Sequence, residues 1–311
     1  MKTHTKTQLQ QRKSVIFFFV FSSIISRIFA QASNSNETTL SGNLNWEKME
    51  INVSMQLKIA DKNVGNPSYR IKAEDNLWLE YIENIRPFIL SIQVDSSSMI
   101  GDLINSGLLP ASSVDEFTMA ARKVPPYYNK DFTAIASSYS IDMNYISEHL
   151  FTKQKLIEMM KPLSVDAGIS YTGIIIMADE PMPVHGKLSK DSIVPSIFPK
   201  IWDSEMNLVF ERNMSYQDKT KGSLFVHWSS ADKVFVKSPS GIDPELAKIV
   251  GTKPLRVIAT ELFGINSTDL VINKDDAVKM LTSDANRKLL QEGRIAIIID
   301  PESLTRVIEL K

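Results

Sequence analysis

Residues 49–59, MEINVSMQLKI, alternate apolar and polar side chains at every position. Successive side chains of a β-strand point to opposite faces, so this pattern predicts a strand with one dry face. Asn66-Pro67 then begins a predicted helix, in which an apolar residue recurs every fourth position from Ala73 to Ile85. We expect this stripe to pack on the dry face of the strand, and Pro87 to kink or end the helix.

Further helices and strands follow on both sides of residue 165. The predicted helices are residues 98–104 with Ser98 as cap, 113–122 with Ser113 and Glu116 as a capping box, 147–161, and 273–290 with Asn273 as cap. The predicted strands are 139–145, 171–178, 197–202 and 208–210 as a hairpin, 224–228, 234–236, 255–263 and 294–299. This mixed order predicts an α+β fold with mixed or antiparallel sheets packed by helices.

The N-terminus has the pattern of an export signal. Basic residues precede an apolar run at residues 14–25, and Arg27 ends that run before it is long enough to span a membrane. Ala30 and Ala32 supply the small residues of a cleavage site. We therefore predict a signal peptide at 1–32, with an uncleaved membrane anchor as the alternative.

The rest of the chain is predicted to form two lobes after a flexible N-terminus at 33–44. The N-terminal lobe covers 45–165 and the strand-rich C-terminal lobe covers 166–311, with one composite sheet as the alternative. Removal of residues 1–32 takes away five basic residues and no acid, so the formal net charge changes from −1 to −6. This acidic balance argues against nucleic acid as a partner. The absence of cysteine excludes disulfides, thiolate metal sites and a lipid-modified cysteine.

The sequence contains no recognisable catalytic, cofactor or metal motif. Three histidines, His149, His185 and His227, lack a second ligand at metal-binding spacing. Asp179-Glu180, at the end of a predicted strand, is the most enzyme-like pair, but neighbouring strand residues point in opposite directions. The acids at 275–276 are better explained by the positive N-terminal end of a helix dipole than by a bound cation. We predict no cofactor, and a secreted hydrolase that uses Asp179 or Glu180 remains the rival hypothesis.

Several short motifs point to a family. They are Asn45-Trp46, Asn66-Pro67, Val94-Asp95-Ser96, Tyr171-Thr172-Gly173, and residues 199–203, 253–255, 268–272 and 289–294. Together they resemble the twenty-kilodalton bacterial surface lipoprotein family, the N-terminal region of flagellar assembly protein T, and spirochaete envelope proteins. The chain departs from this pattern because it lacks the lipidated cysteine and has Asn207 where the family often has a turn glycine.

The resemblance implies a non-enzymatic protein of the cell envelope. We therefore expect a periplasmic protein whose partners are other envelope or flagellar proteins. Contact with the membrane is expected only if the N-terminal segment stays uncleaved.

Overall fold

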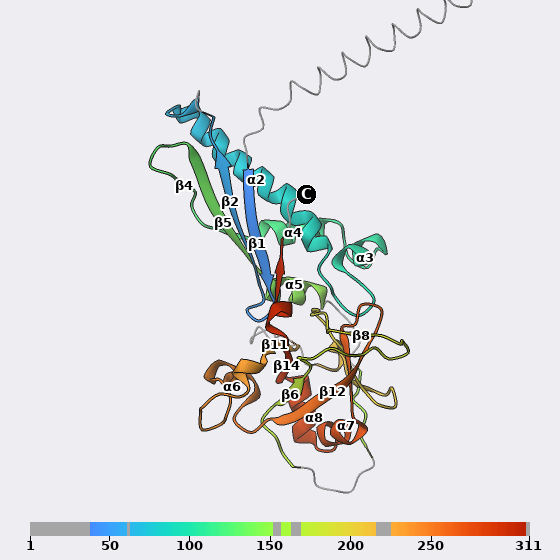
Figure 1. The fold of residues 1–311 in the computed structure, drawn as a ribbon. Helices are drawn as coiled ribbons and strands as arrows, with labels where there is room; N and C mark the ends of the chain where they lie inside the picture. Colours follow the sequence, from blue (N-terminus) through green and yellow to red (C-terminus); the bar gives the residue numbers. More distant parts are fainter. Residues whose placement is uncertain (1–37, 61–62, 152–156, 163–168, 216–224, 309–311) are drawn as a thin grey trace, which may run out of the picture.

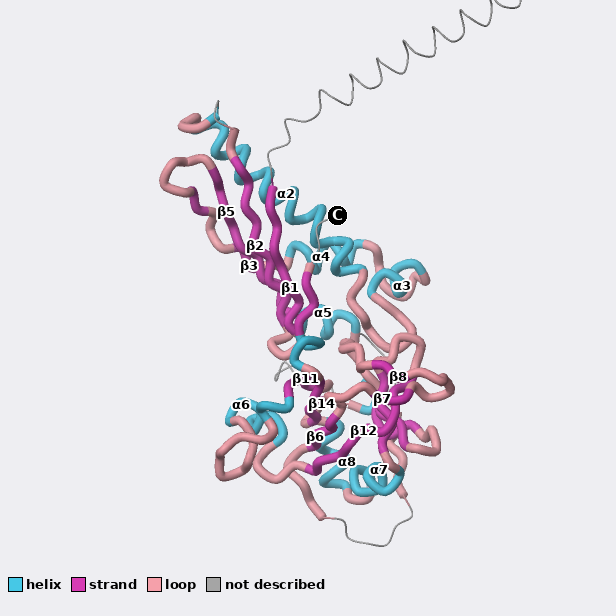
Figure 2. Tube along the Cα trace, viewed as in Figure 1, coloured by secondary structure: helices cyan, strands magenta, loops and turns pink. Residues whose placement is uncertain are grey.

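The computed structural model describes residues 38–60, 63–151, 157–162, 169–215 and 225–308. It confirms the predicted α+β fold, with a large antiparallel sheet, a mixed sheet and a small two-stranded antiparallel sheet among the described residues. The sheets lie in two lobes, one above the other in Figures 1 and 2. We call residues 38–151 with the strand at 305–307 the N-terminal lobe, and residues 169–304 the C-terminal lobe.

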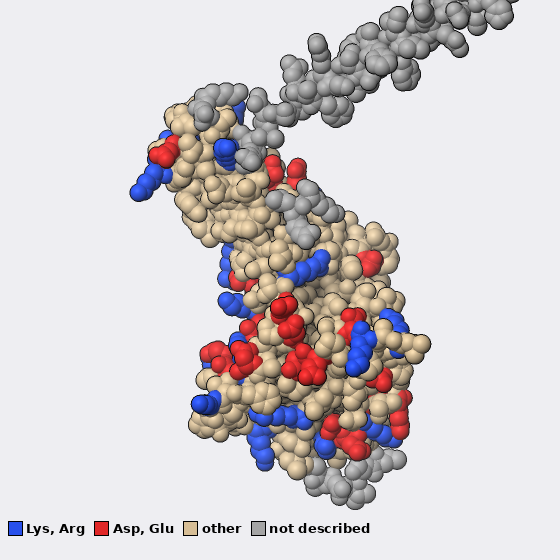
Figure 3. All heavy atoms as spheres, in the orientation of Figure 1, with Lys and Arg blue, Asp and Glu red and all other residues tan. Residues whose placement is uncertain are grey.

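The N-terminal lobe is built on an antiparallel sheet. Its strand order is β15-β1-β2-β5-β3, with β4 also paired to β5. The strands are β1 (Thr38–Asn45), β2 (Glu50–Lys58), β3 (Arg122–Lys123), β4 (Tyr127–Tyr128), β5 (Ala134–Asp142) and β15 (Thr305–Val307). Alternate residues of β2 are buried, as its sequence predicts. The other face of β2 bears polar side chains, and charges are sparse on the side of this lobe shown in Figure 3.

One long helix covers the dry face of this sheet. Helix α2 (Pro67–Leu90) buries the predicted stripe from Ala73 to Ile85, and Asn66 caps it by accepting a hydrogen bond from the Ser68 N–H. Of the two expectations for Pro87, the end of the helix is wrong, because α2 continues past it to Leu90, and the kink stays a prediction. Tyr81 stacks on Tyr139 of β5 at 4.1 Å between ring centroids, which ties helix to sheet.

Three shorter helices complete the N-terminal lobe: α3 (Ile100–Asn105), α4 (Ser112–Met119) and α5 (Met143–Leu150). Two predicted caps are wrong. Ser98 donates its hydroxyl to Asp95, and Met99 takes the cap position instead. Ser113 lies inside α4, whose cap position is Ala111. Helix α5 begins before the predicted residue 147 because the Asp142 carboxylate caps it.

The C-terminal lobe contains a mixed sheet with the order β10-β9-β13-β12-β6-β14-β11. Its strands are β6 (Ile174–Met177), β9 (Ile201–Asp203), β10 (Leu208–Phe210), β11 (His227–Ser230), β12 (Leu255–Phe263), β13 (Asp269–Ile272) and β14 (Ile295–Ile299). The pairs among β12, β6, β14 and β11 are parallel. Every residue of β14 is buried, as a continuous apolar run predicts for a central strand.

Shorter elements surround this sheet. They are β7 (Met182–Pro183), β8 (Lys190–Asp191), α6 (Pro244–Val250), α7 (Lys274–Leu281), α8 (Asp284–Gln291), and the 3-10 turns η2 (Arg212–Met214), η3 (Ala231–Lys233) and η4 (Pro301–Leu304). The single helix predicted over 273–290 is therefore two helices. Ser283 separates them, because its side chain caps α8 by accepting from the Asn286 N–H.

One strand prediction is wrong, and the β9–β10 turn differs from the family's glycine pattern. Residues 234–236 form no strand, since Val234 ends the 3-10 turn η3. In the β9–β10 hairpin, Met206 and not Asn207 takes the left-handed backbone, at φ 60°. Asn207 instead donates its backbone N–H and its side-chain amide to Asp203, at 2.8 and 2.9 Å.

Three further predictions concern the N-terminal segment, residues 38–44 and the boundary between the lobes. The predicted signal segment, with Ala30 and Ala32, lies outside the described residues, as does the predicted lobe boundary at 165–166. Residues 38–44 were expected to be flexible, but they belong to β1, because that stretch pairs along the length of β2. Among the described helices, none has both the length and the apolar character needed to cross a membrane.

Candidate functional site

The predicted acid pair does not assemble a catalytic site. Asp179 and Glu180 follow the end of β6, and Glu180 is exposed. Within the described residues, neither carboxylate forms an ion pair, and neither belongs to a cluster of potential metal ligands. A glycosidase requires two carboxyl groups that face one gap. The geometry therefore gives no support to a hydrolase that uses these two residues.

The three histidines lie in different surroundings. His149 Nε2 is 3.4 Å from Glu116, and His185 Nδ1 is 2.7 Å from Glu261. Burial lowers the pKa of His227 to about 4, so this side chain is neutral at pH 7. In the part of the chain that the structure describes, no group of three His, Asp or Glu side chains could hold a metal ion.

The acids at 275–276 lie in the first turn of α7, as predicted. Asp276 forms an ion pair with Lys279 at 2.7 Å, one turn along the helix. Asn273 occupies the cap position without a capping hydrogen bond from its side chain. These acids thus serve the helix itself, through its dipole and a local ion pair.

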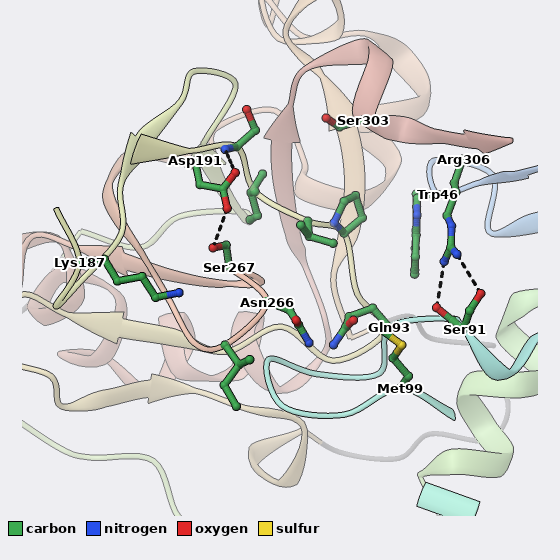
Figure 4. A pocket seen from close by; sticks show the side chains of 15 residues that line it. Trp46, Ser91, Gln93, Met99, Lys187, Asp191, Asn266, Ser267, Ser303 and Arg306 are labelled. Atoms are coloured by element: carbon green, nitrogen blue, oxygen red, sulfur yellow. Dashed lines mark hydrogen bonds between the residues drawn. The ribbon is translucent and has the colours of Figure 1, made fainter. Parts of the chain in front are cut away.

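A cavity of about 690 Å³ lies between the lobes (Figure 4). Trp46, which follows β1, and the segment after α2 line it from the N-terminal lobe. From the C-terminal lobe come Lys187, residues 191–195, which begin at the last residue of β8, and the loop at 265–267. Ser303 of η4 and Arg306 of β15 complete the wall. Five separate parts of the sequence thus meet at one site.

Hydrogen bonds hold the polar side chains of the cavity wall in place. The Asp191 carboxylate accepts from the Ser192 N–H at 2.9 Å and from the Ser267 hydroxyl at 3.0 Å. The Arg306 guanidinium donates to the backbone carbonyl and the hydroxyl of Ser91, at 2.9 and 2.8 Å. A wall whose side chains are fixed in this way is preorganised for binding, because little ordering is left for a ligand to impose.

Apolar side chains form the rest of the wall. Ile193 is buried, whereas Ile265 is 74% and Val194 is 40% exposed. Residues 193–195 line the cavity together with the polar residues Lys187, Asn266 and Gln93. This mixture of apolar surface with a few placed polar groups is typical of small-molecule and peptide sites.

Two sets of contacts join the lobes beside the cavity. In the first, Trp46 packs edge-to-face on Trp228 of β11, with 6.5 Å between ring centroids. The neighbouring Glu47 accepts a hydrogen bond from Ser229 at 2.9 Å and forms an ion pair with Lys233 at 2.7 Å. This ion pair raises the pKa of Lys233, so the charged form is favoured.

The second set joins the segment after α2 to the C-terminal lobe. The backbone N–H of Phe198 donates to Val94 at 2.8 Å, and that of Asn266 donates to Ser96 at 3.2 Å. Gly264 has φ +102°, and a Cβ added there would lie 2.3 Å from the Cβ of Ser96. The lobes therefore approach so closely at this point that only glycine fits.

Comparison with protein-family models accounts for both lobes. The model of the N-terminal domain of Treponema pallidum Tp0624 matches residues 37–149, and the model of its second domain matches residues 173–301. The chain belongs to the Tp0624 domain family of spirochaetes. This confirms the predicted likeness to spirochaete proteins, whereas the likeness to the flagellar and twenty-kilodalton families stays a prediction. A search of curated proteins found no match.

The junction of the two Tp0624-type domains also buries charge. Hydrogen bonds from Ser97 and Ser98 lower the pKa of Asp95, although burial alone would raise it. Arg212 stacks over Phe198 with its guanidinium 4.9 Å from the ring centroid, in a small pocket that Asp95 also lines. Burial raises the pKa of Asp269, which is 1% exposed. These groups lie in the packed junction rather than in the wall of the inter-lobe cavity.

The cavity of this Tp0624-type chain was not predicted from the sequence. Its polar residues Gln93, Asp191, Asn266 and Arg306 are spread over more than 200 positions and match no motif. One indirect signal existed. The Val94-Asp95-Ser96 motif, noted for its family resemblance, is the segment that contacts the C-terminal lobe at the edge of the cavity.

Proposed function

We propose that this protein is exported to the periplasm and acts there as a non-enzymatic binding protein whose ligand occupies the inter-lobe cavity. The observation that carries the proposal is the cavity itself, which combines about 690 Å³ of space with polar side chains fixed by hydrogen bonds. Pockets of some 300–1,000 Å³ are the usual size for ligand sites. The basic and apolar N-terminal pattern supports export.

The partners follow from the same reasoning. An envelope protein that binds a ligand between two lobes works beside other envelope proteins, and a place near the flagellum is the sharpest version. The flagellar version rests on the resemblance of short motifs to the flagellar family. The α+β fold does not support it, because one fold can serve many functions.

The cavity can be tested by blocking it. Val194→Trp places a large side chain at the exposed rim of the cavity. Val124→Trp is the matched control, because Val124 is also exposed, at 52%, and does not line the cavity. Both variants and the wild type would be purified from the native host, and their bound small molecules released and identified by mass spectrometry.

We expect a ligand on the wild type and on Val124→Trp that is depleted from Val194→Trp. An equal yield from all three proteins, or no ligand from any of them, would contradict binding in the cavity. The location requires a second experiment, in which a tagged protein is fractionated and its partners are co-purified. A deletion strain with normal motility, together with a tagged protein away from the basal body, would rule out the flagellar version.

A further inference from the structure

We propose that the inter-lobe cavity takes a peptide that carries a carboxylate, a ligand class that rests on the proposed binding function. Three properties of the wall support this choice. They are a surplus of positive charge, amide groups with hydrogen-bonding capacity to spare, and an apolar surface beside them.

The charge surplus comes from two cations, Lys187 and Arg306, against one acid, Asp191. Lys187 is exposed, and its side chain points into the cavity in Figure 4; it forms no ion pair with any described residue. Arg306 binds the neutral acceptors of Ser91 and so keeps its full charge. Asp191, the acid of the wall, already accepts one hydrogen bond on each carboxylate oxygen. A carboxylate is therefore the ligand group that this wall can best stabilise.

Two side-chain amides fit the peptide groups of such a ligand. The Gln93 side-chain amide donates its N–H groups to the backbone carbonyls of Asp95 and Ser98. Its carbonyl oxygen remains available as an acceptor. The Asn266 side chain makes no hydrogen bond within the described residues, and Figure 4 shows its amide beside that of Gln93. An amide offers one acceptor and two donors, the complement of a peptide group.

The apolar part of the wall distinguishes a peptide from an inorganic anion. Ile193 and Val194 offer aliphatic surface next to the amides, and Ile265 stands at the rim with 74% of its surface exposed. A phosphate or sulfate ion would use none of this surface. A peptide side chain would remove it from water, at a gain of about 25 cal/mol per Å² of apolar area buried.

The test uses the full mature chain and a matched pair of synthetic probes. The acidic probe is acetyl-alanyl-leucyl-glutamate, and the neutral probe is acetyl-alanyl-leucyl-glutamine amide. Binding is measured from backbone and indole NMR shifts in labelled protein, with Lys187→Gln as the test variant. Lys237→Gln is the matched control, because Lys237 is exposed but does not line the cavity.

We expect the acidic probe to bind about tenfold more tightly than the neutral one, a ratio equivalent to about 1.4 kcal/mol. Lys187→Gln should abolish that difference, whereas Lys237→Gln should keep it, and both variants should give wild-type spectra in the absence of probe. Four results would overturn the ligand class. The two probes could bind equally, neither probe could bind, or the shifts could lie outside the cavity. The fourth is that inorganic phosphate competes with the acidic probe and binds tenfold more tightly than that probe. The cavity-blocking experiment uses the ligand from the native host, so its result decides the proposed function separately.

Discussion

Gly264 gives the sharpest test of the contact between the lobes. Its φ of +102° is a conformation that residues with a Cβ rarely adopt. Alanine at this position should cost roughly 1–2 kcal/mol for the backbone alone. The added Cβ would also lie 2.3 Å from that of Ser96, and forcing such overpacking apart should cost roughly 1–3 kcal/mol more. We therefore expect Gly264→Ala to lower the free energy of unfolding by about 2–5 kcal/mol.

Two further variants separate the backbone cost from the collision. Gly107 also has a positive φ, +75°, but no atom lies within 4 Å of the position that an added Cβ would take. Gly107→Ala should therefore show only the backbone cost, about 1–2 kcal/mol. Ser96→Gly removes the atom that collides, so Gly264→Ala should be less harmful in the Ser96→Gly background than in the wild type.

The assay is urea unfolding followed by tryptophan fluorescence. Trp46 and Trp228 contact each other at the junction, so their emission reports on the separation of the lobes. The difference between the two backgrounds gives the coupling energy between residues 96 and 264, which we expect to be about 1–3 kcal/mol. The reasoning is refuted if Gly264→Ala is no more harmful than Gly107→Ala, or if the coupling energy is zero.

Two other substitutions test local features. Burial lowers the pKa of His227 from 6.5 to about 4, so the unfolded chain binds a proton in this range while the folded one does not. The free energy of unfolding of the wild type should therefore fall as the pH drops from 7 to 4. Measured by urea unfolding over that range, His227→Gln should lose about 3 kcal/mol less of this free energy than the wild type. Equal dependence of the two proteins on pH would contradict this. Ser283→Ala removes the cap of α8 and should cost about 1 kcal/mol in a thermal melt, whereas Ser106→Ala, which alters no helix start, should cost less.

The parts of the fold that could be predicted are those fixed by local periodicity. The alternation at residues 49–59 and the stripe of α2 are each set by side chains a few positions apart, and both were confirmed. The continuous apolar run of β14 likewise predicted a strand that is buried on both faces, and all of its residues are buried. Such patterns follow from the geometry of one element, so no knowledge of the partner is required.

The errors lie where a competing side-chain contact, near or distant in the sequence, overrides the local pattern. Ser98 fits the sequence pattern of a helix cap, but the Asp95 carboxylate takes its hydroxyl at 2.8 Å. The apolar pattern of 273–290 continues through the break at Ser283, where the Asn286 side chain instead donates to the carbonyls of Lys279 and Ile169. The cavity is the extreme case, because its wall exists only after both sheets have formed and met.

The path of the chain links this cavity to the stability of the whole protein. After β14, the last strand of the C-terminal sheet, η4 leads directly to β15, which pairs with β1 in the N-terminal sheet. The Trp46 N–H donates to Leu304 on that path at 2.9 Å, and Ser303 and Arg306 beside it line the cavity. The residues that hold the lobes together are thus neighbours of those that would contact a ligand. A ligand at 100 times its Kd that binds only the folded form adds about 2.7 kcal/mol to stability. We infer that this gain would appear in the same unfolding transition that separates Trp46 from Trp228.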